Sequence, residues 1–531
     1  MDFLNGLPVL VLGLGESGLA MARWCARSGA TVRVWDSREP APSAAALAEH
    51  VPNAQWVHGE LTDAAFTDIR LVLKSPGLSP LDERIAAPLR RATESGALVQ
   101  GELELFGRAL VDLKAEQGYA PKVLAITGTN GKTTTTSMTA MLIARTGKRV
   151  AMAGNIGPTM LQTLADALDR EAPQSQPPHQ PPVAPTFEHL PEVWVLELSS
   201  FQLDEAKGFE PDAAAVLNIT QDHLDWHGAM GSYIAAKARV FGQQAVMVVN
   251  RDDPQVEKLV PEPVPGKGLK GRVARPVERH VVRFGLDAPH RPGDFGLVEE
   301  NGMAWLVRAL ESDETMKRGR SKGPVEVQQI HLQRLMPADA LRVRGRHNAA
   351  NALAALALAT AIDCPLAPML HALREYAGEP HRVQYIATLE GVDAFDDSKG
   401  TNVGATVAAL NGLGADRAPS RVVVILGGDG KGQDFAPLLD AVRRNARAVS
   451  LIGRDAALLE DVLADAGVPV QRHQTLQAAT RWCFERAHSG DAVLLSPACA
   501  SLDMFRNYVH RADVFVAEVH AIVADQGGVA A

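Results

Sequence analysis

The chain has 531 residues, which is long enough for three or four domains. Hydrophobic residues make up 46% and charged residues 22%, so the composition excludes global disorder, a collagen-like chain and a coiled coil. The 53 lysines and arginines stand against 62 aspartates and glutamates, a net charge of −9. This mildly acidic balance argues against a dedicated nucleic-acid binder or a membrane-surface protein.

The four cysteines lie far apart, and none belongs to a Cys-x-x-Cys pair: Cys25, Cys364, Cys483 and Cys499. We therefore expect a reducing compartment, with neither a disulfide framework nor a zinc site. No stretch reaches the roughly 18 apolar residues that a membrane-spanning helix needs. The apolar run near the N-terminus lacks the preceding basic residues of a signal peptide. These features predict a cytoplasmic protein with no membrane insertion.

Strand-like apolar runs alternate with helix-like runs along almost the whole chain. This alternation predicts α/β domains with parallel sheets covered by helices. In the first block we predict strands at Val9–Leu12, Val32–Trp35 and Leu71–Lys74. The turn Gly13-Leu-Gly-Glu-Ser-Gly18 joins the first strand to a helix that continues through Ala26.

This turn has the Gly-x-Gly-x-x-Gly pattern of dinucleotide-binding proteins. Its glycines let backbone N–H groups approach a phosphate at the helix N-terminus. Asp36 lies 18 residues after Gly18, where a carboxylate that binds ribose would stand. Taken alone, the pattern predicts NAD binding, with a tight turn that holds no ligand as the alternative. The identity of the nucleotide stays open at this point.

The second block opens with a predicted strand, Val123–Thr127, that leads into Thr127-Gly-Thr-Asn-Gly-Lys-Thr133 and a helix. This arrangement is typical of a phosphate loop, although Ile126 stands where the full pattern has its first glycine. Lys132 can reach the β- and γ-phosphates of ATP, and the hydroxyl of Thr133 can bind Mg²⁺. The context favours ATP binding over a chance junction of a strand and a helix.

Two nucleotide-type turns in one chain narrow the possible functions. A dehydrogenase needs only the first turn, and a simple ATPase needs only the second. A protein that activates one substrate with ATP while it holds another, nucleotide-linked substrate needs both.

Two further predicted strands of this block, Val193–Leu198 and Ala214–Leu217, lead into polar residues. Glu197 lies at the end of the first strand, where a Mg²⁺ ligand belongs when a phosphate loop is near. Asp222 and His223 follow the second strand on a loop at the same edge. A single histidine is more often structural, but beside Glu197 His223 becomes a candidate metal ligand.

Lys237 lies on a predicted helix and would, by itself, be a surface lysine. Asn348 and Asn351 begin an Ala-rich helix at i, i+3 spacing, so they share a face or one of them caps the helix.

Three stretches interrupt the second block. Residues 171–192 hold seven prolines, which predicts a disordered or extended surface loop. Residues 261–292 and 311–324 are predicted insertions within a β-rich part. The basic run at 316–322 is predicted to be a solvated loop rather than a nucleic-acid site.

The third block opens near Val383 and contains apolar strands predicted at Val422–Leu426, Val449–Ile452 and Ala492–Leu495. Three turns rich in small and polar residues follow apolar strands: Asp397-Ser-Lys-Gly-Thr401, Gly427-Gly-Asp-Gly-Lys431 and Ser496-Pro-Ala-Cys-Ala-Ser501. Three such turns in one domain predict a ligand site that faces the ATP.

Taken together, these motifs resemble the Mur ligase family over nearly the whole chain outside the insertions. The family signature comprises the phosphate loop, Glu197, the helix start His347-Asn-Ala-Ala-Asn351 and His381-Arg382. The D-glutamate-adding branch is marked by Glu197-Leu-Ser-Ser-Phe-Gln-Leu203, Asp397-Ser-Lys-Gly-Thr-Asn402, Gly427–Lys431 and Ser496-Pro-Ala-Cys-Ala-Ser-Leu-Asp503. The sequence departs from this branch at Gly400, Tyr508 and Ala512, where Ala, Phe and Gly are more usual.

The resemblance implies three domains: a Rossmann-like UDP-binding domain at 1–110, a central P-loop-type ATPase domain with a parallel sheet at 111–378, and a Rossmann-like α/β domain at 379–531. It implies a site for a UDP-linked substrate instead of NAD, made by Gly15, Glu16, Ser17, Asp36, Ser37, Arg38, Ser75, Gly77 and Asn155. The implied ATP contacts are Gly128, Thr129, Asn130, Gly131, Lys132, Thr133, Asn348, Asn351, Arg382 and Asp397. The implied D-glutamate side is Asp222, Lys399, Thr401, Lys431, Ser501, Leu502 and Tyr508.

The resemblance also implies two Mg²⁺ sites, held by Thr133, Glu197, His223 and a carbamylated Lys237. Lys132, Glu197, His223 and Lys237 are thus the expected catalytic residues. The implied reaction is ATP-dependent formation of an amide bond through an acyl phosphate. It joins D-glutamate to UDP-N-acetylmuramoyl-L-alanine in the synthesis of peptidoglycan precursors. We expect a monomer with no nucleic-acid partner.

Two other functions stay open on the sequence. A sister ligase of the same family would add a different amino acid, and an NAD-dependent oxidoreductase would use only the first glycine turn.

Overall fold

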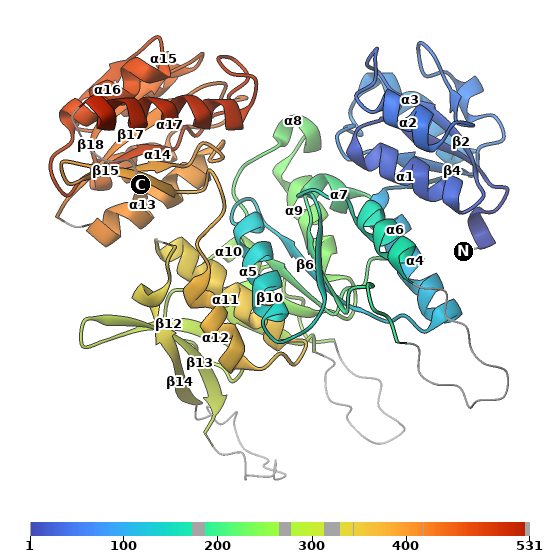
Figure 1. The fold of residues 1–531 in the computed structure, drawn as a ribbon, viewed down its shortest axis with the longest axis horizontal. Coiled ribbons are helices and arrows are strands. Elements are labelled where there is room, and N and C mark those ends of the chain that lie inside the picture. The colour runs from blue at the N-terminus through green and yellow to red at the C-terminus, as the bar shows by residue number, and fades with distance from the viewer. Residues whose placement is uncertain are drawn as a thin grey trace.

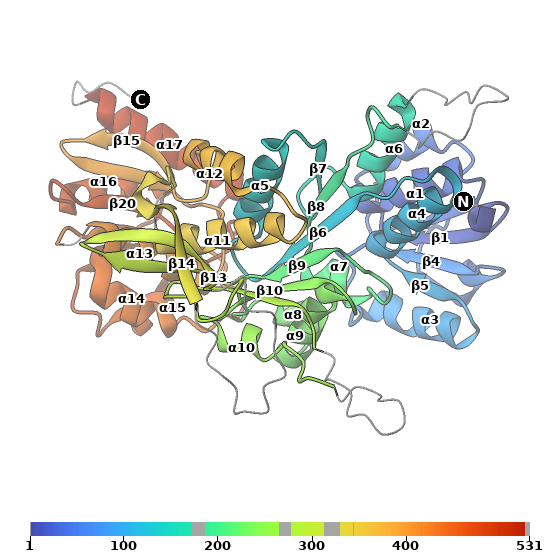
Figure 2. The same ribbon diagram turned by 90° about the horizontal axis from the view of Figure 1, so that it is seen from below.

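The computed structural model describes residues 2–171, 186–264, 278–312, 330–343, 345–417 and 419–525. Within these ranges the chain forms three α/β units, each built around its own sheet. The central unit lies between the N-terminal and C-terminal units, as the two views in Figures 1 and 2 show. The predicted fold class is therefore confirmed.

The N-terminal domain has a fully parallel sheet in the order β3-β2-β1-β4-β5. Its strands are β1 (Pro8–Leu12), β2 (Thr31–Trp35), β3 (Gln55–Trp56), β4 (Leu71–Lys74) and β5 (Leu98–Gln100). Its helices are α1 (Glu16–Arg27), α2 (Ala44–His50) and α3 (Glu83–Glu94). The three predicted strands agree with β1, β2 and β4 to within one residue. Helix α4 (Glu102–Gln117) leads into the central domain, and the domain border predicted at 110 falls inside it.

The central sheet has the order β14-β13-β12-β11-β10-β9-β6-β8-β7. Its parallel strands are β6 (Lys122–Thr127), β7 (Val150–Gly154), β8 (Val193–Glu197), β9 (Ala213–Val216), β10 (Val246–Asn250), β11 (Val281–Phe284) and β12 (Phe295–Glu300). Two antiparallel strands, β13 (Met303–Glu311) and β14 (Ile330–Pro337), extend one edge. Inside the stretch 261–292, predicted as an insertion in a β-rich part, the structure has β11 (Val281–Phe284), which pairs with β10 in this sheet.

The helices of the central domain include one that is buried almost all round. They are α5 (Lys132–Ala144), α6 (Met160–Arg170), α7 (Ser200–Asp204), α8 (Leu224–His227), α9 (Met230–Ala238), α10 (Pro254–Glu257), α11 (Arg346–Thr360) and α12 (Leu366–Glu375). The Ala-rich helix α11 packs against α5, and its residues 352–359 are at most 1% exposed. Small alanine side chains allow this close packing, and α11 brings its first turn to the phosphate loop.

The C-terminal sheet has the order β15-β16-β20-β17-β18-β19, parallel except for the β15–β16 pair. Its strands are β15 (Gln384–Leu389), β16 (Val392–Asp396), β17 (Val422–Gly427), β18 (Ala446–Ile452), β19 (Val470–Arg472) and β20 (Ala492–Leu495). Its helices are α13 (Val403–Arg417), α14 (Pro437–Asn445), α15 (Ala456–Leu463), α16 (Leu476–Arg486) and α17 (Tyr508–Asp525). Strands β17 and β20 are buried on both faces, as apolar strands of parallel sheets are.

The N-terminal and C-terminal domains differ in whether they share a hydrophobic core with the central domain. One cluster of buried apolar side chains runs from the N-terminal domain into the central domain and includes Leu14, Phe106 and Trp194. The two clusters around the C-terminal sheet contain only side chains from that domain. The N-terminal and central domains therefore share a core, whereas the C-terminal domain has its own.

Two sequence predictions fall on residues outside the described ranges. The proline-rich loop predicted at 171–192 lies mostly in 172–185, and the basic run at 316–322 lies in 313–329. No helix in the described part of the chain has the length and apolar character needed to cross a membrane.

Candidate active site

The phosphate loop lies between β6 and α5, at the carboxyl edge of the central sheet. Gly131 has a φ of +82°, and a Cβ there would approach Asn351 Oδ1 to 2.7 Å, so glycine suits this position. Lys132 Nζ donates hydrogen bonds to the carbonyls of Gly128 (3.0 Å) and Thr129 (2.9 Å). Burial lowers the pKa of the Lys132 amine. The loop is folded around its lysine, and Asn351 of α11 lies beside it.

Glu197 ends β8, next to the strand that carries the phosphate loop. Its side chain is 1% exposed, and Oε1 accepts a hydrogen bond from Asn155 Nδ2 at 2.8 Å. The other oxygen, Oε2, is buried and has no hydrogen-bond partner among the described residues. A buried carboxylate oxygen without a protein donor is free to bind a cation, so Glu197 fits the metal-ligand role.

Lys237 of α9 is a buried lysine at this edge and not the surface lysine that helices usually carry. Its Nζ donates to the Gly128 carbonyl at 2.8 Å and lies 4.6 Å from the ring centroid of Tyr233. Burial lowers the pKa of Lys237 well below its usual value, and the charge of Lys132 adds to this effect. A neutral amine is nucleophilic, which fits carbamylation.

Asp222 and His223 stand on the loop after β9. His223 has a φ of +54°, and its ring packs edge-on against Phe201 at 4.7 Å between centroids. Burial lowers the pKa of His223, while Asp222 opposes this shift. The imidazole is thus kept in the neutral form that ligates metals. The charge of Lys431, from the C-terminal domain, also acts to lower this pKa.

The described residues contain no group of three or more His, Cys, Asp or Glu side chains that could hold a metal ion. Glu197 and His223 are too few to hold a metal ion by themselves, but Mg²⁺ at a nucleotide site also binds phosphate oxygens and waters. Such a partial protein ligand set is usual for Mg²⁺ at nucleotide sites.

The C-terminal domain reaches the phosphate loop directly. Arg382 donates from Nη2 to Thr133 Oγ1 at 2.7 Å. The side-chain amides of Asn402 and Asn130 exchange two hydrogen bonds, at 3.2 and 3.1 Å, and Asn402 also donates to Asp222 Oδ2 at 3.3 Å. These contacts bring together residues that are 180 to 272 positions apart in the chain.

Other predicted ATP residues lie close by. Asn351 Nδ2 donates to Asn348 Oδ1 at 3.2 Å, so the two share a face as their spacing predicts. Asp397 is buried and accepts a hydrogen bond from Ser496 Oγ at 2.6 Å. Burial raises the pKa of Asp397 to about 7, against the effects of Ser496 and Arg382.

The predicted D-glutamate residues form a looser group. Lys399 Nζ lies 5.4 Å from the ring centroid of Tyr508, and burial lowers its pKa. Ser501 is buried, whereas Leu502 is 70% exposed. Thr401 donates its backbone N–H to the Lys399 carbonyl at 3.0 Å. Lys431 is exposed.

Most of the predicted UDP-substrate residues lie around the first glycine turn, whereas Asn155 donates a hydrogen bond to Glu197 in the central domain. A Cβ on Gly18 would lie 1.9 Å from the Gly13 carbonyl oxygen, so the turn requires glycine there. Asp36 Oδ2 accepts the Leu14 N–H at 2.6 Å, and Arg38 binds both Asp36 oxygens at 2.9 and 2.8 Å. Although burial favours the protonated form, these hydrogen bonds lower the pKa of Asp36 to about 2.

Six more of the predicted UDP-substrate residues lie in this turn or on the segments beside it: Gly15, Glu16, Ser17, Ser37, Ser75 and Gly77. Ser75 Oγ donates to the Gly13 carbonyl at 2.8 Å, and the Glu16 carboxylate faces Gly157, whose Cβ would lie 3.9 Å from Oε2. A Cβ at Gly15 or Gly77 would meet nothing within 4 Å, so the backbone is open there. Ser17 is the second residue of α1, after Glu16, and Ser37 lies between Asp36 and Arg38.

Several residues that support the site were not predicted from the sequence. Asn218 holds the phosphate loop, because its side chain accepts from the Asn130 N–H (2.8 Å) and donates to the Asn130 carbonyl (3.0 Å). Tyr233 supports both Lys237 and Thr129, whose Oγ1 lies 2.9 Å from the Tyr233 hydroxyl. Asn402 lies inside the string Asp397–Asn402 quoted above, and Asn218 and Tyr233 each lie four residues before a predicted site residue, Asp222 and Lys237, so closeness in sequence was the available signal.

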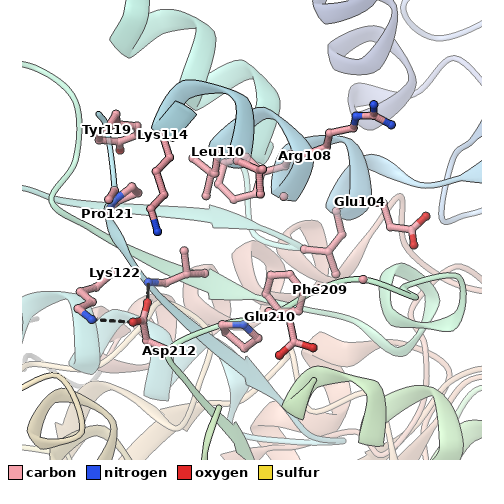
Figure 3. Close-up of a pocket in the computed structure, with 18 of the residues that line it drawn as sticks. Glu104, Arg108, Leu110, Lys114, Tyr119, Pro121, Lys122, Phe209, Glu210 and Asp212 are labelled. Atoms are coloured by element: carbon pink, nitrogen blue, oxygen red, sulfur yellow. Dashed lines mark hydrogen bonds and ion pairs between the residues drawn. The ribbon is translucent and has the colours of Figure 1, made fainter. Parts of the chain in front are cut away.

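A cavity of about 860 Å³ lies away from the residues described above, and Figure 3 shows the side chains that line it. It lies between α4 and the segments 119–123 and 208–212, at the amino edge of the central sheet. The exposed ion pair of Lys122 and Asp212, at 2.8 Å, lies on its wall. None of the predicted site residues lines it.

Comparison with known proteins agrees with this arrangement. Residues 8–99 match the Mur ligase MurD-like N-terminal domain, residues 126–359 the Mur ligase middle domain and residues 381–499 the Mur ligase glutamate ligase domain. The chain belongs to the Mur ligase family.

Curated relatives and solved structures add detail. The chain is 58% identical over 530 residues to a protein of Albidiferax ferrireducens named UDP-N-acetylmuramoylalanine–D-glutamate ligase, covering 99% of this chain and 98% of that protein. A protein of the same name from Burkholderia cenocepacia is 56% identical over 524 residues, covering 98% of each. The crystal structure of MurF ligase from Thermotoga maritima in complex with ADP has a similar fold, with a TM-score of 0.54, 14% identity and coverage of 98% of this chain and 99% of that one.

Proposed function

We propose that this Mur ligase joins D-glutamate to UDP-N-acetylmuramoyl-L-alanine, using ATP. The observation that carries the proposal is the 58% identity, over 99% of the chain, to a protein named for that reaction. The buried Glu197 oxygen without a donor, beside the phosphate loop, supports the use of ATP with Mg²⁺. Family membership gives no support to the NAD-dependent oxidoreductase that the first glycine turn alone would predict.

The first half of the reaction activates a carboxylate. The carboxylate of the muramoyl-alanine substrate attacks the γ-phosphorus of ATP, the bond to ADP breaks, and an acyl phosphate forms. Lys132 neutralises charge on the transferred phosphoryl group, and Arg382 and Asn351 lie where they can orient the nucleotide. Glu197, His223 and Thr133 would hold Mg²⁺, which would supply further charge neutralisation.

The second half forms the amide. The amine of D-glutamate attacks the acyl carbon, the C–N bond forms, and phosphate leaves as the C–O bond breaks. The amine must lose a proton, and we propose Asp222 as the acceptor, because the free ring nitrogen of neutral His223 is assigned to Mg²⁺. Lys399, Thr401, Lys431, Ser501, Leu502 and Tyr508 form the proposed amino-acid side, with Lys431 as a counter-charge for a carboxylate of D-glutamate. The interface with the C-terminal domain must exclude water, which would hydrolyse the acyl phosphate.

The finer assignments belong to the same proposal. We propose that Lys237 is carbamylated and helps to hold a second Mg²⁺, because its buried amine has a lowered pKa and contacts the phosphate loop. The N-terminal domain would hold the UDP moiety through the residues around Gly15 and Asp36. We also propose that the protein acts as a cytoplasmic monomer.

The experiment is phosphate release from ATP and Mg²⁺ with UDP-N-acetylmuramoyl-L-alanine, testing D-glutamate, L-glutamate, L-alanine and L-lysine separately. Release with D-glutamate alone is expected. Release with another amino acid would retain the ATP site and overturn the assignment of Lys431 and Ser501. No release with any of them would overturn the proposed substrate.

A further inference from the structure

One buried lysine has no part in the mechanism above. Lys74 ends β4 in the N-terminal domain, and its side chain is 1% exposed. Its Nζ donates to the Leu78 carbonyl at 2.7 Å, pairs with Glu205 Oε1 at 3.1 Å and lies 5.3 Å from the ring centroid of Trp226. All three N–H donors of this ammonium group thus have a carbonyl, a carboxylate or an aromatic face within reach.

Two of these partners belong to the central domain. Glu205 follows α7, and Trp226 lies in α8 and is 7% exposed. Burial raises the pKa of Glu205, and the charge of Lys74 opposes that shift. A buried ion pair rarely adds net stability, because both ions lose their hydration. The better explanation for this pair is that it fixes how the two domains meet.

The residues after Lys74 also contact α8. Ser75 and Gly77, proposed above to bind the UDP-linked substrate, directly follow Lys74, and Ser79 Oγ donates to the Trp226 carbonyl at 3.0 Å. We call residues 74–79 the Lys74 segment. The Lys74 segment therefore carries two proposed substrate contacts. It also contacts both the ring and the carbonyl of Trp226 in α8.

Trp226 continues the connection towards the chemistry. Its ring packs on Phe201 at 4.8 Å, and Phe201 packs on His223 at 4.7 Å. His223 immediately precedes α8, so a shift of Trp226 moves the start of that helix. The Lys74 ammonium, Trp226, Phe201 and His223 form one continuous series of side-chain contacts. This series runs from the N-terminal domain to His223, the proposed metal ligand.

We propose that Lys74 is a positioning residue that couples binding of the UDP-linked substrate to the placement of His223. The proposal rests on the proposed function for the identity of that substrate. Lys74 itself is too deeply buried to touch a ligand, so it acts through Trp226 and through the Lys74 segment.

The test uses the double variant Lys74→Met/Glu205→Gln. Lys74→Met alone leaves a buried, unpaired carboxylate and can fail to fold for that reason. The double variant removes both charges, so its melting temperature should lie near that of the wild type, while the contact with Trp226 is still lost. Lys122→Met is the matched control, because it removes a lysine from an ion pair that is 57% and 31% exposed, at the opposite edge of the central sheet.

Two binding measurements, neither of which needs turnover, report on the two ends of this series of contacts. Calorimetric titration gives the Kd for UDP-N-acetylmuramoyl-L-alanine. A second titration gives the Mg²⁺ concentration at which binding of a non-hydrolysable ATP analogue is half-maximal. In the double variant both values should rise about tenfold, the effect expected for loss of one buried cation–π contact and one hydrogen bond. In Lys122→Met both should stay within about twofold, since exposed ion pairs contribute little.

A merely structural lysine would lower the melting temperature and leave both titrations unchanged, which would overturn the proposal. A weaker Kd with an unchanged Mg²⁺ requirement would also overturn it, because the effect would stop before His223. Failure of the proposed function would appear separately, as wild-type enzyme that binds the UDP-linked substrate but does not join D-glutamate to it.

Discussion

The central domain meets its two neighbours through interfaces of opposite character. At the N-terminal interface, apolar side chains from both domains merge into one buried cluster, and a buried ion pair joins Lys74 to Glu205. At the C-terminal interface the hydrophobic clusters stay separate, and hydrogen bonds cross from Arg382 to Thr133 and between Asn402 and Asn130.

This difference indicates which interface opens during catalysis. Separating a shared hydrophobic core exposes apolar area to water, which is costly. Exchanging a few hydrogen bonds with water costs only about 1 kcal/mol for each bond. Arg382 contacts Thr133, a proposed ATP and Mg²⁺ ligand, so this contact must rearrange when nucleotide enters. We infer that the C-terminal domain moves over a relatively fixed pair of domains.

The largest effect is expected from a substitution that leaves both interfaces intact and removes the negative charge of Glu197. Glu197→Gln keeps the shape and the hydrogen bond from Asn155 but loses the negative charge beside the phosphate loop. We expect kcat to fall by about 10²-fold or more, as for other lost electrostatic stabilisers. The phosphate-release assay measures this, and near-normal kcat would remove Glu197 from the metal site.

Lys237 should have the next largest effect. Its lowered pKa leaves more neutral amine at pH 7, the form that reacts with carbon dioxide. Enzyme incubated with ¹³C-labelled bicarbonate should show a carbamate carbon signal that Lys237→Met lacks. Removing dissolved carbon dioxide should lower kcat severalfold, and bicarbonate should restore it. Full activity without carbon dioxide and no carbamate signal would contradict the assignment.

The sequence predicts best those parts of the fold and the site that are formed by residues close together in the chain. The phosphate loop, its strand and its helix lie within the continuous stretch 122–144, so local pattern predicted them correctly. The carboxyl ends of parallel strands meet at one edge, which is why Glu197 and His223 were predicted beside the loop. The assignment of roles to the site residues as a whole remains a prediction.

Contacts between distant segments escaped prediction for a physical reason. Nothing local to Lys74 shows that Glu205 and Trp226 will cover it, and most lysines at strand ends are solvated. Asn402 and Asn130 meet across 272 positions, and their pairing depends on how two domains dock. The strand Val281–Phe284 was placed in an insertion because four residues carry too little periodicity to outweigh their polar flanks.

The C-terminal interface can be weakened through Asn402. Asn402→Ala removes the reciprocal amide pair with Asn130 and the donor to Asp222. Loss of two or three hydrogen bonds that water can partly replace should lower kcat/KM by about five- to tenfold. Most of this loss should appear under conditions in which domain closure limits the rate. Asn445→Ala, which removes an amide pair with Asn411 inside the C-terminal domain, is the control. An equal loss in both variants would mean that the interface has no special role.

The smallest effect on activity, and the clearest on stability, is expected at the N-terminal interface. Glu102 begins α4, is fully buried, and accepts the Leu161 N–H of α6 at 2.9 Å. Burial raises the pKa of Glu102 to about 7, against the effect of the Leu161 hydrogen bond. Between pH 4.5 and 7 the folded protein therefore holds a proton that the unfolded chain releases. This group stabilises the fold fully below pH 4.5, and its contribution is lost as the pH rises to 7.

Glu102→Gln cannot titrate, so its melting temperature relative to the wild type should increase by a few °C from pH 5 to pH 7 and then level off. Differential scanning calorimetry across this range measures the difference, with Glu83→Gln on the exposed face of α3 as the control for lost charge. If the N-terminal interface stays closed during turnover, the same pH dependence should persist when substrates are bound. A pH dependence that disappears on binding the UDP-linked substrate would show instead that this interface also opens, and the contrast between the two interfaces would fail.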